Sequence, residues 1–130
     1  MIVDSSAIIA VLQKEPEAAR LGKVMSLDPE CLVSAANWLE AGMNLFMRFG
    51  HQGYYDLQLL VAKTPIEIVS VTPRQADLAL RAFMKYGKGV HPARLTFGDC
   101  FAYALAKDSG EPLLFKGGDF TQTDVAAAAY

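Results

Sequence analysis

Four carboxylates stand where the surrounding sequence favours burial or a tight turn. Asp4 interrupts the apolar start MIVDSSAIIAVL, Glu40 lies within SAANWLEAGMNL, Asp99 occurs in LTFGDCFAYALAK, and Asp119 follows LLFKGG. Burial of an ionised carboxylate is costly unless a cation or hydrogen-bond donors surround it. Oxygen ligands without a nearby histidine or cysteine suit Mg²⁺ or Mn²⁺ rather than zinc. An acidic cluster of this kind assists the attack of water on a phosphodiester.

Each carboxylate also has a local structural explanation. Asp4 could cap the helix that follows it, because an Asp side chain accepts hydrogen bonds from free helix N–H groups. Thr96 and Asp99 have the spacing of a capping box, and Asp119 after two glycines fits an Asx turn. Glu40 could lie at the edge of an apolar stripe and reach solvent. The arrangement of the elements decides between the two interpretations.

Short apolar segments alternate with helical patterns along the chain. We expect strands at residues 1–4, 31–34, 66–71 and 113–115, and helices at residues 5–13, 16–27, 35–49, 53–63, 73–86 and 96–108, with a tail at 125–130 that pairs weakly or frays. This alternation indicates a parallel α/β sheet that is covered on both faces. Ligands bind such sheets at the carboxyl ends of the strands. Asp4 and Asp119 follow strands, and Glu40 and Asp99 lie on helices that leave the same edge, so the topology predicts that all four meet.

The composition is that of one domain, which we take to span residues 1–130. Counted with glycine and without tyrosine, about 56% of the residues are apolar, against ~45–50% in ordinary domains, which favours a surface buried by a partner. The two cysteines lack the spacing of a zinc site or a disulfide framework. No run of ~18 apolar residues occurs. We therefore predict a cytoplasmic protein with no membrane segment.

Basic residues are concentrated in one segment of a chain whose net charge is −2. Residues 74–94 contain one acid, Asp77, and five bases, which are Arg74, Arg81, Lys85, Lys88 and Arg94. A basic segment on an acidic body is compatible with an anionic substrate that touches one side, and equally with a solvated helix face. Lys85, Lys88 and Arg94 precede Asp99, and Lys116 precedes Asp119, so these four are candidate RNA-phosphate contacts.

Together, the segments IVDSSAIIAVL, SAANWLEAGMNL, LTFGDCFAYALAK and LLFKGGDFTQTD resemble those of the PIN-domain ribonucleases. More narrowly, they look like VapC, the toxin of type II toxin–antitoxin systems. The resemblance covers essentially the whole chain. It implies a three-layer α/β/α sandwich with a central, mainly parallel sheet of four to five short strands. It also implies a toxin that is a Mg²⁺-dependent endoribonuclease, with Mn²⁺ as the alternative ion.

The resemblance also assigns roles to individual residues. Asp4 and Asp99 match the principal Mg²⁺ ligands of the family, and Glu40 matches its third acid. Asp119 matches the acid of a fourth, more variable motif. Ser6 matches the small hydroxyl residue that supports the first Asp. The four carboxylates are therefore the expected catalytic residues, and no site for an organic cofactor is expected.

Gly118 departs from the family pattern, because related toxins often carry an acidic or amide residue there. This departure leaves Asp119 as either a catalytic or a structural residue. It also favours an alternative, a degenerate PIN domain that binds RNA or protein without turnover, although the intact Asp4, Glu40 and Asp99 oppose it. Phosphotransfer proteins of the receiver or haloacid-dehalogenase type fit less well, because DSSA lacks the DxD motif and no Asp ends the strand expected at residues 31–34 or at 66–71.

Two helical segments have more apolar side chains than one buried stripe needs. They contribute Trp38, Met43, Phe46, Met47, Phe49, Tyr54, Tyr55, Leu59 and Leu60. VapC-like proteins form homodimers and bind a cognate VapB-like antitoxin, a segment of which covers the acidic site. The resemblance therefore implies a homodimer, and a heterotetramer or larger complex with the antitoxin, in addition to the RNA substrate.

Overall fold

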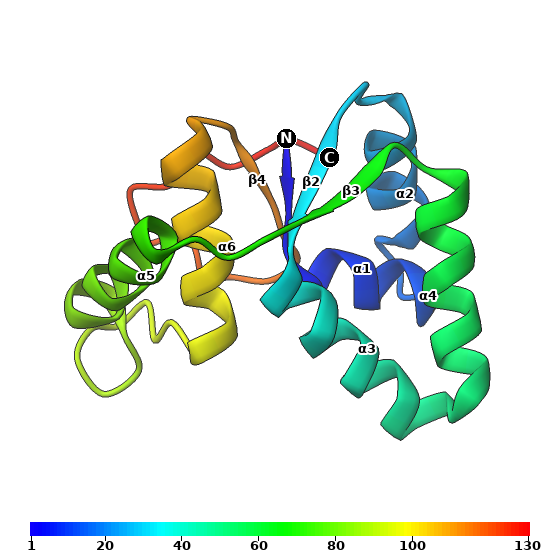
Figure 1. Cartoon of the computed structure of the whole chain (residues 1–130), viewed down its shortest axis with the longest axis horizontal. Coiled ribbons are helices and arrows are strands. Elements are labelled where there is room, and N and C mark those ends of the chain that lie inside the picture. The colour runs from blue at the N-terminus through cyan, green and yellow to red at the C-terminus, as the bar shows by residue number, and fades with distance from the viewer.

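A four-stranded parallel sheet lies at the centre of the molecule, as the computed structural model of residues 1–130 shows (Figure 1). The strands are β1 (Ile2–Val3), β2 (Cys31–Ser34), β3 (Ile66–Val69) and β4 (Leu113–Leu114), in the order β3-β2-β1-β4. The helices are α1 (Ser5–Leu12), α2 (Ala18–Leu27), α3 (Ala35–Phe49), α4 (His51–Lys63), α5 (Pro73–Tyr86) and α6 (Phe97–Ser109). All three strand pairs are parallel, so all carboxyl ends lie at one edge.

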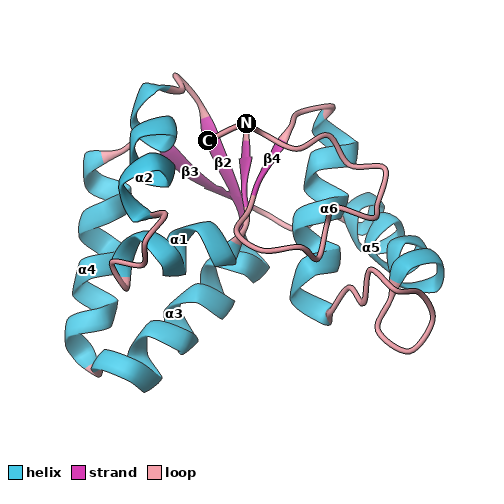
Figure 2. Ribbon diagram, turned by 180° about the vertical axis from the view of Figure 1, so that it is seen from behind, coloured by secondary structure: helices cyan, strands magenta, loops and turns pink.

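Helices cover both faces of the sheet, which confirms the three-layer prediction. Helices α1 to α4 lie on one side and α5 and α6 on the other, as the view from behind also shows (Figure 2). Successive strand residues alternate between the two cores: Ile2 and Leu113 pack with α5 and α6, whereas Val3 and Leu114 pack with α1 to α4. This alternation follows from the two-residue period of a strand. Both cores therefore share the same short strands.

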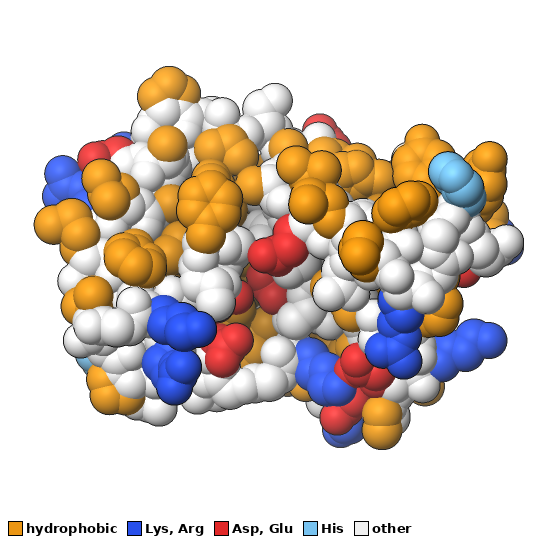
Figure 3. Space-filling view, turned by 90° about the horizontal axis from the view of Figure 1, so that it is seen from below, with side chains coloured by type: hydrophobic (Ala, Val, Ile, Leu, Met, Phe, Trp, Pro, Cys, Tyr) orange, Lys and Arg blue, Asp and Glu red, His pale blue; other side chains and the backbone are white.

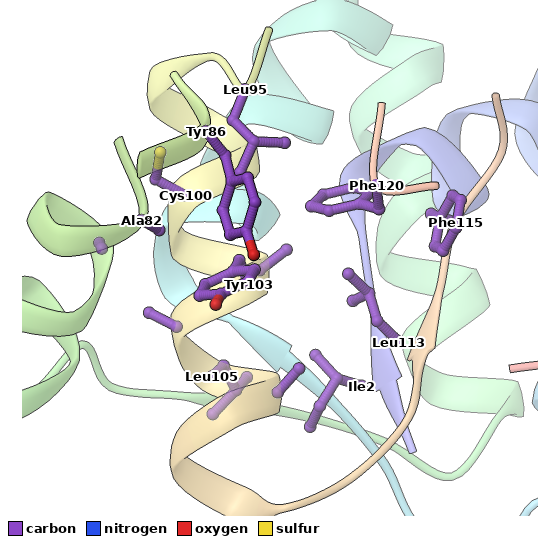
Figure 4. Close-up of a cluster of buried hydrophobic side chains, with 14 of the residues drawn as sticks. Ile2, Ala82, Tyr86, Leu95, Cys100, Tyr103, Leu105, Leu113, Phe115 and Phe120 are labelled. Carbon is purple, nitrogen blue, oxygen red and sulfur yellow. The ribbon is translucent and has the colours of Figure 1, made fainter. Parts of the chain in front are cut away.

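The C-terminal segment at residues 115–124 packs into the core between the sheet and helices α5 and α6. Tyr86 and Tyr103 pack together with ring centroids 5.9 Å apart, and Phe115 and Phe120 with centroids 5.0 Å apart (Figure 4). The Tyr103 hydroxyl donates a hydrogen bond of 2.6 Å to Asp124. These contacts anchor both ends of the turn that carries Asp119, at residues 115–120 and again at 124.

The predicted elements are all present, with small differences at their ends. Strand β1 stops before Asp4 because that residue caps α1. Strand β3 ends at Val69, and α4 begins directly after Gly50, two residues earlier than predicted. The tail pairs weakly, as expected, through a single bridge between Leu113 and Ala127. No helix combines the length and the apolarity that crossing a membrane requires.

Candidate active site

Asp4 is buried at the carboxyl end of β1, with 1% of its surface exposed. One of its oxygens, Oδ2, accepts a hydrogen bond of 2.9 Å from the Ser6 backbone N–H, so the predicted helix cap is present. The other oxygen, Oδ1, is buried and has no hydrogen-bond partner. Burial raises the pKa of Asp4 to about 7; the Ser6 hydrogen bonds oppose this shift, and the charges of Asp99 and Glu40 add to it. Helix capping thus explains the position of Oδ2 but leaves Oδ1 without a hydrogen-bond partner.

Glu40 is held half-buried between α1 and α6. The Ser5 hydroxyl donates a hydrogen bond to its Oε1. On the opposite side, Gly98 lies so close that a Cβ atom there would overlap the carboxylate. The apolar stripe expected around Glu40 is not core, because Met43 and Met47 are 62% and 82% exposed. The carboxylate therefore lies between the protein interior and an exposed apolar face of α3.

Asp99 serves as both a helix cap and a member of the acidic cluster. Its Oδ2 accepts a hydrogen bond of 2.8 Å from the Thr96 N–H, and the Thr96 hydroxyl accepts one of 3.4 Å from the Asp99 N–H, which completes the capping box. Burial raises the pKa of Asp99; the Thr96 hydrogen bonds oppose this shift, and the charges of Asp119 and Glu40 add to it. The capping box uses Oδ2 and leaves Oδ1 available.

Asp119 is exposed in the turn that follows β4. Gly117 allows this turn, because its φ of 97° is one that glycine adopts readily. The charge of Asp119 acts on Asp99, whereas Asp99 and Glu40 act on Asp4, so each of the four carboxylates lies within electrostatic reach of at least one other. Acidic side chains occupy a central hollow in the view from below (Figure 3). No three acidic, histidine or cysteine side chains form a closed metal-binding group in this arrangement.

Two polar contacts connect the segments that carry the carboxylates. Asn37 is completely buried, and its side-chain N–H donates a hydrogen bond of 2.9 Å to the carbonyl of Gly98, directly before Asp99. The Ser6 hydroxyl accepts one of 3.0 Å from the Lys116 backbone N–H. Ser5, Asn37 and Gly98 are not among the functional residues predicted from the sequence. The available signals were an Asn one helical turn before Glu40 and a glycine directly before an acidic residue.

The four predicted phosphate contacts differ in their surroundings. The Lys116 ammonium pairs with Glu15 and with Glu17, the latter at 3.3 Å, and the Lys85 ammonium lies 5.0 Å from the centre of the Tyr86 ring. The side chains of Lys88 and Arg94 make no ion pair or hydrogen bond and line a hollow of about 500 Å³ in the loop before α6. Lys88 and Arg94 are thus the two predicted contacts whose charges remain free.

The raised pKa of Asp4 makes the stability of the protein depend on pH. The folded protein keeps this proton up to about pH 7, whereas the unfolded chain loses it near its ordinary pKa, so stability falls as pH rises between these values. Asp4→Asn removes this cost. Its stability relative to wild type should therefore increase by on the order of 3 kcal/mol between pH 4 and pH 8. Urea unfolding of the metal-free proteins measures this difference. Asp77→Asn, at an exposed ion pair of α5, should show no such increase.

Known proteins resemble this chain both in sequence and in fold. The PIN-domain family model matches residues 1–126. Ribonuclease VapC30 of Mycobacterium tuberculosis is 45% identical over 129 residues, which cover 99% of this chain and 98% of that protein. Ribonuclease VapC of Mycolicibacterium smegmatis is 46% identical over 127 residues, or 98% of each chain.

Solved structures share the same fold at much lower sequence identity. VapC20 of Mycobacterium tuberculosis, described as a sarcin-ricin loop cleaving toxin, has a TM-score of 0.80 at 19% identity over 99% of this chain and 98% of that one. A toxin–antitoxin complex from Klebsiella pneumoniae has a TM-score of 0.74 at 17% identity, over 99% and 97%. These structures show the likeness of fold.

Proposed function

This chain belongs to the PIN-domain family, among its VapC ribonucleases, and we propose that it is the endoribonuclease toxin of a toxin–antitoxin pair, with Asp4, Glu40, Asp99 and Asp119 as its catalytic carboxylates. One observation supports this site above all. Asp4 keeps an unpartnered oxygen in a buried position beside two further carboxylates. Such a site is costly for the fold, and a bound cation offsets the cost.

The residues present fit a divalent cation. The donors are all carboxylate oxygens, which Mg²⁺ prefers and Mn²⁺ accepts. Asp4 and Asp99 would hold the ion through the oxygens that their caps leave free, with Glu40 and Asp119 beside them. When bound, such an ion neutralises charge on the phosphodiester and lowers the pKa of a coordinated water.

The protein's own groups hold the carboxylates in position for the reaction. The Ser6 N–H fixes one oxygen of Asp4, and the Ser5 hydroxyl fixes Oε1 of Glu40. Because both serines lie in the first turn of α1, a single helix start orients two acids from different elements. We assign Glu40 and Asp119, the two carboxylates outside the pair that would hold the ion, to orienting the attacking water.

The exposed apolar side chains of α3 and α4 fit the assembly that VapC proteins form. Met43, Met47 and Tyr55 are at least 62% exposed, and Phe46 and Tyr54 about half. Such a large apolar area is typical of a protein interface. We propose that a second copy of this chain covers the part of this area on α4 and that a VapB-like antitoxin covers the part of α3 beside the acidic site, as a heterotetramer or a larger complex.

The function is tested by incubating total cellular RNA with purified, antitoxin-free protein. Discrete fragments that require Mg²⁺ or Mn²⁺, disappear with EDTA and are suppressed by added antitoxin would support the proposal, and their ends would identify the target. A folded protein that binds RNA but produces no fragments with either metal would instead support the degenerate binding domain, which the glycine at position 118 favours.

Loss of the two free charges in the loop before α6 should weaken RNA binding. We expect Lys88→Ala with Arg94→Ala to reduce the salt dependence of RNA affinity, lowering the slope of log K against log salt by about one to two, because two fewer counterions are released. Fluorescence anisotropy with the Asp99→Asn protein as background measures binding without cleavage. Lys23→Ala with Lys63→Ala removes the same charge from α2 and α4 and should leave the slope unchanged; equal effects of the two pairs would rule out a specific contact.

A further inference from the structure

A cavity of about 470 Å³ opens between α3 and α6, directly beside the acidic site. Glu40 and Gly98 form part of its wall, so whatever fills the cavity lies next to the carboxylates. The remaining wall is largely apolar and includes Met43, Met47 and Phe97. In the view from below, apolar side chains lie next to the acidic side chains of the central hollow (Figure 3).

Phe97 is the most unusual part of this wall. It is the first residue of α6, two positions before Asp99, and 78% of its surface is exposed. Its ring meets that of Phe101 at 4.9 Å and an angle of 81°, a geometry that aromatic pairs prefer and that holds the ring in place. Aromatic rings exposed beside a nucleic-acid path are platforms on which bases stack.

A polar group completes the cavity. Asn44 lines it, and the Asn44 Oδ1 accepts a hydrogen bond of 3.1 Å from the side-chain amide of Gln13. Gln13 in turn accepts one of 3.0 Å from Arg48, so this chain of contacts orients both amides. The Asn44 NH₂ group is therefore left as a donor without a partner. Apolar walls with one hydrogen-bond donor suit a nucleobase, whereas the negative Glu40 in the wall disfavours an acidic side chain.

We propose that this cavity is a nucleobase subsite: it holds the base of a nucleotide adjacent to the scissile phosphate, with Phe97 stacking on the base and Asn44 donating to its edge. The inference rests on the proposed ribonuclease function and adds a specificity-determining residue to it. The competing occupant is an apolar side chain from a second copy of this chain.

The test uses the RNA that the wild-type protein cleaves, in a normal form and with the base removed from the nucleotide on either side of the cut. Phe97→Ala should lower kcat/KM on normal RNA about tenfold to a hundredfold, the range of a lost base stack. Phe97→Tyr should restore it. Met84→Ala truncates another largely exposed apolar side chain, on α5, and serves as the control that should behave like wild type.

The abasic substrates separate a stacking role from a structural one. For one of the two abasic positions, the wild type should lose as much activity as Phe97→Ala loses on normal RNA, and the variant should lose nothing further. If the loss from removing the base and the loss from Phe97→Ala multiplied when the two changes were combined, the subsite proposal would be wrong. A loss that accompanies dissociation to monomers, measured by light scattering, would also overturn it and assign Phe97 to contact between copies. A wild type that cuts no RNA contradicts the proposed function itself, before any variant is compared.

Discussion

Asp99→Asn should reduce RNA cleavage by about a hundredfold to a thousandfold or more while leaving the fold intact. The substitution removes one of the two charges that would hold the cation, and the loss of one group that stabilises developing charge has effects of this size. Asparagine keeps an oxygen that can accept the hydrogen bond from the Thr96 N–H, so the capping box survives. Alanine would also remove the cap, at a cost of about 1 kcal/mol, which makes Asn the cleaner variant.

Single-turnover cleavage and thermal melting measure the two parts of this expectation. Asp108→Asn is the matched control, because Asp108 lies on the same helix and pairs with Arg74 through a 2.6 Å contact outside the acidic cluster. The control should cleave RNA at nearly the wild-type rate, with a modest change in stability. If the Asp99→Asn protein cleaved RNA as fast as the control, Asp99 would not belong to the active site.

Gly98→Ala should lower the rate of RNA cleavage about a hundredfold, although glycine carries no functional side chain. A Cβ atom at this position would occupy the space of the Glu40 carboxylate. The Glu40 side chain is flexible and half-exposed, so the carboxylate moves and the backbone stays. A displacement of about 1 Å in a catalytic group is enough for a loss of this size. Melting temperature should change little, because no buried apolar contact is lost.

A double-mutant cycle identifies the cause of that loss. In a Glu40→Ala background, Gly98→Ala should have almost no further effect, since the carboxylate that it displaces is gone. Gly42→Ala on α3 is the matched control, because its Cβ would meet only a Leu57 methyl group at 3.4 Å, an ordinary contact. Equal losses with and without the Glu40 carboxylate would show that Gly98→Ala acts through the backbone of α6 instead.

Local patterns were sufficient to predict the layers of the fold and the edge of the sheet at which the acids were expected. Continuous apolar strands indicated a parallel sheet, and in such a sheet the carboxyl ends share an edge. Asp4 lies at this edge, and Asp119 lies in the turn that follows β4. The capping explanations for Asp4 and Asp99 were also correct. Each carboxylate has two oxygens, so capping with one oxygen and membership of the cluster are compatible.

Contacts between distant segments could not be predicted in this way. The hydrogen bond from Asn37 to Gly98 joins residues 61 positions apart, and it depends on how α3 and α6 cross. The pairing of Lys116 with Glu15 depends likewise on the loop between α1 and α2. Helical periodicity also placed the stripe of Met43 and Met47 without showing whether core or solvent faces it. These contacts and exposures depend on how the helices and loops pack against one another in the folded protein.

The order in which the acids occur along the chain has a consequence for synthesis. The site draws on the first strand, on α3, on the start of α6 and on the turn after β4, which is the last strand to be made. A chain that is still growing on the ribosome therefore lacks Asp119 and the strand that flanks Asp4 until the segment after α6 has been made. Domains fold as units when their last elements emerge. A nascent chain without β4 and the turn after it therefore cannot yet bring Asp119 to Asp4, Glu40 and Asp99.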